Sequence, residues 1–151
     1  MPSRTLETWP HGAIMQDAQH TRFALWAPDA SDVSVELHNG QSVPMLPQAE
    51  GWFVAHVCCG AGTRYHYTID GEQKVPDPAS RLQHADVHGD SVVVDPLAYP
   101  WRHANWQGRP WHEAVIYELH VGILGGYAAV EQHLPRLAEL GVTAIELMPL
   151  A

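Results

Sequence analysis

The segment that most constrains the fold is 114–151, which predicts a strand, a helix and a second strand. Two apolar runs, 114–121 and 142–148, flank a stretch in which valine and leucine recur at three- and four-residue steps, the period of an amphipathic helix. Gly141 follows the last periodic residue, where a helix end favours a residue that adopts a positive φ. Parallel strands joined by such a crossover are covered on both faces. One strand–helix–strand unit cannot cover its own sheet, so we expect this segment to begin a larger domain.

Residues 1–98 show a different pattern, in which short runs alternate apolar and polar residues as half-buried antiparallel strands do. The runs are 21–27, 33–37, 51–57, 64–69 and 91–94. Asn39 with Gly40, and Asp70 with Gly71, are dipeptides typical of hairpin turns. Short strands at this spacing, without a helical pattern between them, predict a β-sandwich.

A third segment, 99–112, separates the two patterns. It is rich in proline and tryptophan and has little periodicity. We interpret it as a connector that is ordered by its tryptophans rather than flexible like a Gly/Ser linker. These tryptophans are Trp101, Trp106 and Trp111.

Composition excludes several classes of function. Eight Lys+Arg against seventeen Asp+Glu give a formal net charge of −9, which argues against a nucleic-acid partner. No apolar run approaches the roughly 20 residues of a membrane-spanning helix, and the N-terminus lacks a signal-peptide apolar region. Two cysteines, Cys58 and Cys59, are too few for a disulfide framework. We therefore expect a cytoplasmic protein without a membrane partner. The eleven histidines are scattered without metal-ligand spacing, so we expect no metal and no cofactor.

Several ordered motifs resemble one enzyme superfamily. Segment 22–37 (RFALWAPDASDVSVEL) with 51–53 (GWF) resembles the N-terminal immunoglobulin-like domain of α-amylase-superfamily enzymes that act on branched or modified α-glucans. Segment 75–96 (VPDPASRLQHADVHGDSVVVDP), followed by 114–122 (AVIYELHVG) and 137–151 (LAELGVTAIELMPLA), most closely resembles the malto-oligosyltrehalose trehalohydrolase family. Glycogen-branching and debranching enzymes share the layout but match the second motif less well.

The resemblance implies a mainly-β chain with three parts. These are an early-set immunoglobulin-like β-sandwich at 1–98, the connector at 99–112, and the first β-α-β of a (β/α)8 TIM barrel at 113–151. The family carries a longer loop after the first barrel strand, of the form HVGTFTPEGTF, whereas residues 122–127 are shorter here. Such loops form the active-site face of a barrel, so glucan contacts at this point are expected to differ.

The resemblance also implies a glycoside hydrolase of trehalose biosynthesis, which cleaves the α-1,4 bond next to the trehalose end of malto-oligosyltrehalose. The retaining reaction uses an Asp nucleophile and a Glu acid/base, with carboxyls about 5–5.5 Å apart, and a second Asp. In this superfamily these residues lie on barrel strands four, five and seven, so we expect them beyond residue 151 and expect the chain alone to be inactive. The alternatives are a stand-alone α-glucan-binding or interaction module, or the N-terminal part of a branching or debranching enzyme.

Three polar residues of 113–151 are candidates for supporting a sugar cleft: Glu118, His120 and Glu146. Alternation along a strand predicts that Glu118 and His120 lie on the same side, near the strand end where barrel chemistry occurs. The alternative is a set of buried polar residues that hydrogen-bond to each other and to the backbone. The edge of the second strand, if uncovered, predicts self-association, folding back onto the sandwich, or disorder.

Aromatic residues of the predicted sandwich are candidates for stacking on glucose rings. They are Trp26, Trp52, Tyr65 and Tyr67. The alternative is that they pack in the core or between domains. Asp77 and Arg81 lie in the PDPASR motif, which predicts an Asx-type turn with a local Asp–Arg pair, or a loop that docks the sandwich on the barrel.

Overall fold

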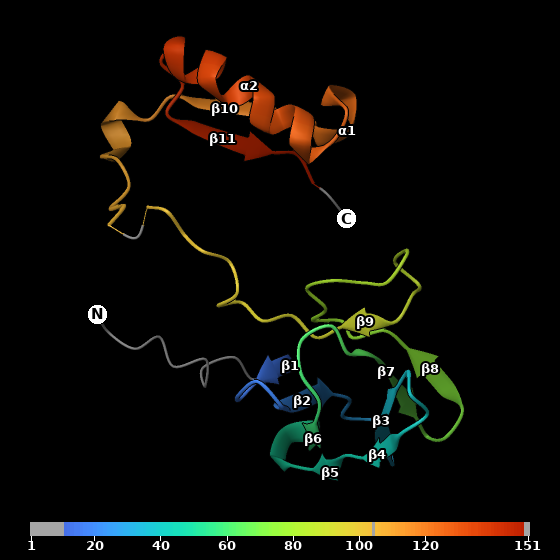
Figure 1. Ribbon diagram of the computed structural model, residues 1–151. Coiled ribbons are helices and arrows are strands. Elements are labelled where there is room, and N and C mark those ends of the chain that lie inside the picture. The colour runs from blue at the N-terminus through green and yellow to red at the C-terminus, as the bar shows by residue number, and fades with distance from the viewer. Residues whose placement is uncertain (1–10, 104, 150–151) are drawn as a thin grey trace. The chain divides into compact units, whose positions relative to one another are not determined.

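The computed structural model describes residues 11–103 and 105–149. The chain forms two compact units, Met1–Pro100 and Trp101–Ala151, which are described separately (Figure 1). The division between them lies inside the predicted connector, which contains a short 3-10 helix at Trp111–Glu113. The three connector tryptophans are exposed, and that they order this segment stays a prediction.

The first unit is a sandwich of two antiparallel sheets. One sheet has the order β1-β2-β6-β5, and the other has the order β4-β3-β7-β8 with β9 also paired to β7. The strands of the first sheet are β1 (Gly12–Met15), β2 (His20–Trp26), β5 (Leu46–Pro47) and β6 (Trp52–Cys58). Those of the second are β3 (Val33–Leu37), β4 (Ser42–Pro44), β7 (Arg64–Ile69), β8 (Gln73–Val75) and β9 (Ser91–Val92). The predicted β-sandwich is confirmed.

The core lies between the two sheets and follows from the alternation in the sequence. Phe23 and Leu25 of β2 point inward beside Phe53 of β6, and Tyr65 and Tyr67 of β7 enter from the other sheet. The rings of Phe23 and Tyr65 meet edge to face, with centroids 4.7 Å apart. Each fully buried large apolar side chain contributes about 1.5–3 kcal/mol, so these central strands provide most of the unit's stability.

Both predicted hairpin turns are present. Gly40 has a φ of +89° between β3 and β4, and Asp70 and Gly71 have φ of +52° and +69° between β7 and β8. The Asn39 side chain accepts a hydrogen bond from the Gln41 N–H at 2.9 Å. In the second turn, positive φ at both Asp70 and Gly71 suits the twist of a tight hairpin.

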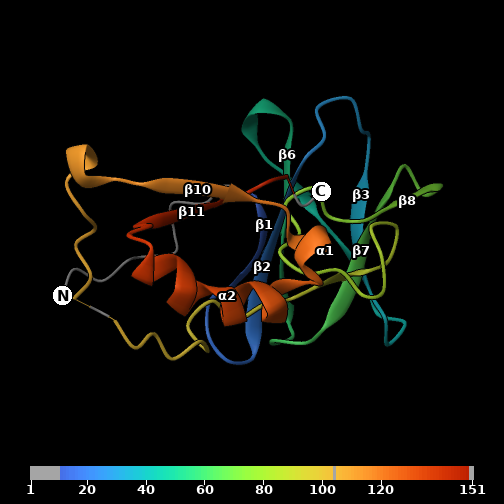
Figure 2. The same cartoon turned by 90° about the horizontal axis from the view of Figure 1, so that it is seen from above.

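The second unit contains a parallel pair of strands, as predicted. It comprises β10 (Ile116–Leu119), α1 (Val121–Leu124), α2 (Tyr127–Glu139) and β11 (Ala144–Leu147). Figures 1 and 2 both show α2 running along the two strands. A small core of Leu119, Val121 and Val130, with Leu124, Leu137 and Leu147 packed against it, joins helix to sheet. Side chains Ile116 and Ile145 are exposed, so the strand pair retains apolar surface.

Candidate functional site

The candidate site lies on the outer face of the β1-β2-β6-β5 sheet. Cross-strand pairing sets Trp26 of β2 opposite Trp52 of β6, and Ala24 opposite Val54. Directly opposed residues of antiparallel strands project to the same side of the sheet, and the alternating neighbours Leu25 and Phe53 are buried in the core. The sequence therefore places two indoles next to each other, outside the core.

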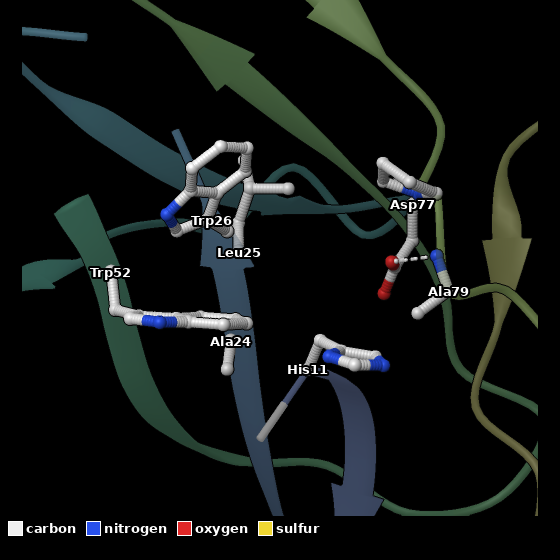
Figure 3. A pocket seen from close by; sticks show the side chains of 8 residues that line it. His11, Ala24, Leu25, Trp26, Trp52, Asp77 and Ala79 are labelled. Atoms are coloured by element: carbon white, nitrogen blue, oxygen red, sulfur yellow. Dashed lines mark hydrogen bonds between the residues drawn. The ribbon is translucent and has the colours of Figure 1, made fainter. Parts of the chain in front are cut away.

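A cleft of about 500 Å³ opens beside these indoles. Figure 3 shows the ring planes of Trp52 and His11 seen on edge, with the indole of Trp26 above them and Ala24 at the base. The Trp52 and His11 rings are nearly parallel, with an interplanar angle of 9° and centroids 5.9 Å apart. The cleft is lined by His11, Ala24, Leu25, Trp26, Trp52, Asp77, Pro78 and Ala79.

A tight turn before β6 fixes both indoles. The Trp26 Nε1–H donates to the Glu50 carbonyl at 2.9 Å, and Glu50 itself has a φ of +60°. The next residue, Gly51, has a φ of +81°, and a Cβ there would lie 2.6 Å from Cα of Pro28. Only glycine fits this close approach, so the turn sets where Trp52 begins its strand.

Asp77 forms the opposite wall and is itself held by the core. The residue is 4% exposed, and its carboxylate accepts hydrogen bonds from the Tyr65 hydroxyl at 2.7 Å and the Tyr67 hydroxyl at 3.1 Å. It also accepts from the Ala79 N–H at 2.7 Å, and the Asp77 N–H donates to Ser91 Oγ at 2.9 Å. Burial raises the pKa values of Tyr65 and Tyr67 well above those of ordinary tyrosines, and the negative charge of Asp77 raises them further. Both tyrosines are therefore neutral donors.

These contacts correct two expectations. Tyr65 and Tyr67 are 1% and 0% exposed, so the prediction that they stack on glucose is wrong and the core-packing alternative holds. The Asx-type turn at Asp77 is confirmed by its contact with the Ala79 N–H. The local pair with Arg81 is not formed, because the Asp77 carboxylate turns inward to the tyrosines while Arg81 is exposed.

Among the residues that the structure describes, the cleft lining does not contain the carboxylate pair of a glycosidase. Its lining has one carboxylate, Asp77, and that carboxylate already accepts three hydrogen bonds. Retaining hydrolysis needs two carboxyls about 5–5.5 Å apart. Trp52 also lines a second hollow of about 510 Å³ on the same sheet face, with Arg22, Val54 and His56. The aromatic surface is therefore open on both sides of Trp52.

The candidates of the second unit are arranged differently from the prediction. Glu118 and Glu146 are directly paired across β10 and β11, whereas His120 lies beyond the end of β10. There it caps α1, with Nδ1 accepting from the Ile123 N–H at 3.1 Å. All three side chains are exposed, so they do not form the buried hydrogen-bonded set that was the alternative. Support of a sugar cleft by these residues stays a prediction.

Sequence reasoning missed His11, Pro78 and Ala79 as lining residues. His11 precedes a four-residue strand with no alternating pattern of its own, and the other two lie in a loop positioned by Asp77. Within 11–103 and 105–149, no group of three or more His, Cys, Asp or Glu side chains is arranged to hold a metal ion. In the same ranges, no helix has the length and apolarity that crossing a membrane requires.

Sequence relatives are found over most of the chain. A malto-oligosyltrehalose trehalohydrolase from Deinococcus radiodurans is 41% identical over 134 residues, which are 87% of this chain and 22% of the relative. One from Rhizobium sp. is 39% identical, covering 94% of this chain and 26% of the relative. A 1,4-α-glucan branching enzyme from Ralstonia nicotianae is 36% identical, covering 89% and 21%. The chain thus spans about a quarter of the length of the curated relatives it matches.

Solved structures give a consistent result. A candidate α-amylase from Salmonella typhimurium is 43% identical with a TM-score of 0.86, covering 93% of this chain and 25% of that one. A pullulanase variant from Paenibacillus barengoltzii complexed with maltotetraose is 28% identical with a TM-score of 0.75, covering 92% and 27%.

Residues 10–98, more than half of the chain, match carbohydrate-binding module 48 (isoamylase N-terminal domain). Its sandwich fold and this match show that the chain belongs to the carbohydrate-binding module 48 family, here in the N-terminal arrangement of α-amylase-family enzymes.

Proposed function

We propose that this chain is the N-terminal part of a glycoside hydrolase that cleaves the α-1,4 bond next to the trehalose end of malto-oligosyltrehalose and releases trehalose. The observation that carries the proposal is the 41% identity to the Deinococcus radiodurans trehalohydrolase, which extends over 87% of the chain and thus beyond the carbohydrate-binding module. Six further relatives of that name are 36–39% identical over 84–94% of the chain. The branching enzyme, at 36% identity, is the main competitor.

A domain exchange tests this proposal. The N-terminal region of the Deinococcus radiodurans enzyme that aligns with this chain is replaced by residues 1–151, and trehalose release from maltotriosyltrehalose is measured. We expect a folded chimera that retains at least about a tenth of the parent's kcat/KM, a loss of no more than about 1.4 kcal/mol in transition-state stabilisation. A chimera that is folded by circular dichroism but releases no trehalose would contradict the proposal. The 151-residue chain alone is the matched control and is expected to release none.

A second function is favoured by the cleft on the sandwich. We infer that Trp52, with Trp26 and His11, contacts a glucose ring of an α-glucan. The support is geometric: the Trp52 and His11 rings are nearly parallel, the Trp26 indole is held by its hydrogen bond to Glu50, and the cleft of about 500 Å³ has space for a sugar ring. Apolar C–H faces of glucose pack on aromatic faces.

Titration of the full chain with maltoheptaose, followed by intrinsic tryptophan fluorescence, tests this contact. We expect a saturable change that Trp52→Ala weakens roughly tenfold, as the loss of one aromatic contact of about 1.4 kcal/mol predicts. Trp106→Ala, at an exposed connector position, is the matched control and should leave the affinity unchanged. Absence of saturation with the folded wild-type chain would contradict glucan binding by the module without affecting the trehalohydrolase proposal.

A further inference from the structure

A third hollow of the first unit, distinct from the two beside Trp52, gathers five basic side chains of an acidic chain. It has a volume of about 540 Å³ and lies where β7, β8 and the end of β3 meet the loop that precedes β9. Lys74, the only lysine of the sequence, lines it together with Arg64. Three histidines, His38, His84 and His88, complete the basic lining. We call these five residues with Asp90 the basic basin.

Asp90 is the anion at the centre of the basin, and its side chain is 10% exposed. One oxygen, Oδ2, lies 3.2 Å from an Arg64 guanidinium nitrogen and 3.6 Å from His38 Nδ1. The other, Oδ1, lies 3.3 Å from Lys74 Nζ and 3.4 Å from His66 Nδ1. Two carboxylate oxygens therefore serve four nitrogen-bearing groups, of which two are permanent cations. The basin therefore holds more hydrogen-bond donors than the two oxygens of Asp90 can satisfy.

A second carboxylate, that of Asp86, also lines the hollow, and both it and Glu36 already accept hydrogen bonds. Asp86, in the loop, accepts a hydrogen bond from the His88 N–H at 2.8 Å. Glu36 of β3, opposite His66 in register, accepts from the Ser34 and Ser42 hydroxyls at 3.3 and 3.1 Å. Meanwhile the Lys74 and His38 side chains are more than half exposed. An ammonium carries three donors, so Lys74 has donors left for a ligand.

The loop that carries His84 and His88 is tightly built. The His84 N–H donates to the Asp90 carbonyl at 2.8 Å, and the Gln83 side chain donates to the Val87 carbonyl at 2.7 Å. Ala85 has a φ of +74°, an uncommon conformation for a residue with a Cβ, and such strain is concentrated at functional sites. The loop therefore holds its two histidines at the hollow by backbone geometry.

We propose that the basic basin binds a small multivalent anion whose recognised chemistry is a phosphate group, either inorganic phosphate or a sugar phosphate. Arg64 and Lys74 supply permanent positive charge, and the guanidinium and ammonium donate to phosphate oxygens. The volume suits a small ligand rather than a polymer. The ring nitrogens of His38, His84 and His88 are further hydrogen-bond partners for a ligand in the same hollow.

Two groups at the basin have shifted pKa values. Burial, and then the charge of Lys74, lower the pKa of His66, so His66 is neutral at pH 7. Burial acts to raise the pKa of Asp90, but its hydrogen bond and charge interaction with Lys74, aided by His66 and Arg64, lower it overall. Asp90 therefore keeps its negative charge at pH 6.0, and Arg64 and Lys74 supply the positive charge that a phosphate meets.

Calorimetric titration of the full chain tests the basin, with inorganic phosphate and glucose 6-phosphate as separate probes at constant ionic strength. We expect saturable binding at pH 6.0. Lys74→Gln should weaken it roughly tenfold, whereas Arg81→Gln, an exposed arginine outside the basin, should not. Equal affinity for both probes assigns recognition to the phosphate group alone, and a preference for glucose 6-phosphate assigns the site to sugar phosphates.

A second measurement needs no variant. Because Lys74 is the only lysine, its acetylation by an active ester is read by mass spectrometry as a single side-chain modification, with the N-terminal amine as internal control. We expect phosphate, but not the same ionic strength of chloride, to slow acetylation of Lys74 several-fold. Failure of both probes to saturate at pH 6.0, or equal acetylation with phosphate and chloride, overturns the proposal.

Discussion

The hydroxyl of Tyr65 lies 2.7 Å from Oδ2 of Asp77, inside the sandwich. This contact joins the core of the second sheet to the loop that walls the aromatic cleft, because Pro78 and Ala79 follow directly on Asp77. Tyr67 donates to the same oxygen at 3.1 Å. The position of the cleft wall thus depends on buried hydroxyl groups that never touch a ligand.

Removal of one of these hydroxyls should destabilise the first unit. Tyr65→Phe leaves the ring in place but deprives a buried carboxylate of a donor, which costs about 1–3 kcal/mol. Urea unfolding should show the loss as a lower midpoint at unchanged m-value. Tyr127→Phe, on an exposed tyrosine of α2, is the control. A Tyr65→Phe stability within about 0.5 kcal/mol of wild type would contradict this role, since that is the range of surface substitutions.

Alkaline titration should distinguish the two buried tyrosines from the rest. Burial and the charge of Asp77 raise the pKa of Tyr65 and Tyr67 so far that neither ionises at pH 11 while the chain is folded. The ultraviolet absorbance change at pH 11 should therefore be the same for wild type and for Tyr67→Phe. A smaller change in Tyr67→Phe would show that this hydroxyl titrates in the native state.

The turn that positions the indoles should not tolerate a side chain at Gly51. Gly51→Ala combines a φ of +81° with a Cβ only 2.6 Å from Cα of Pro28, so we expect a loss of about 3 kcal/mol or more. Gly62→Ala is a matched control, because its φ of +84° is similar and nothing lies within 4 Å of the added carbon. The control isolates the conformational cost, about 1–2 kcal/mol. An equal loss in the free energy of unfolding for Gly51→Ala and Gly62→Ala would contradict this, because it would mean that Pro28 moves away from the added Cβ at little cost.

Stability should decrease in two steps on acidification. The native pKa of His66 is lowered by burial and Lys74, so the unfolded state binds more protons as the pH falls below about 6.5 and stability declines there. The native pKa of Asp90 is also lowered, mainly through Lys74 against the opposing effect of burial. Its contribution is present above about pH 4 and is lost as the pH falls further.

Urea midpoints at pH 8, 6, 4 and 3, at constant ionic strength and without phosphate, measure both steps. His66→Gln should reduce the decrease in the urea midpoint between pH 8 and pH 6 and leave the decrease below about pH 4 unchanged. A urea midpoint that increases as the pH is lowered from 7 to 5 would contradict the prediction, because a histidine held neutral in the native state must lower stability on acidification.

Local patterns predicted the central strands, the two hairpin turns and the crossover helix, since alternation and turn chemistry act over a few residues. The short strands β1, β4, β5 and β8 were missed. Pro44 and Pro47 lie in two of them, and proline is confined to edge or peripheral strands that carry little alternation. Side-chain contacts that alternation does not encode decided the rest. Asp77 turned to Tyr65 and Tyr67 rather than to Arg81, and His120 capped α1 through the Ile123 N–H instead of continuing the strand.

Paired chimeras distinguish a trehalohydrolase from a branching enzyme, by placing residues 1–151 in the trehalohydrolase of Deinococcus radiodurans and in the branching enzyme of Ralstonia nicotianae. The measurement is each chimera's kcat/KM relative to its own parent, with trehalose release and formation of α-1,6 branches as the two readouts. If the chain belongs to a trehalohydrolase, we expect the first chimera to keep at least about 0.1 of its parent's kcat/KM, and the second to keep a fraction at least about tenfold lower. The reverse order, with both chimeras folded, would contradict it and assign the chain to a branching enzyme.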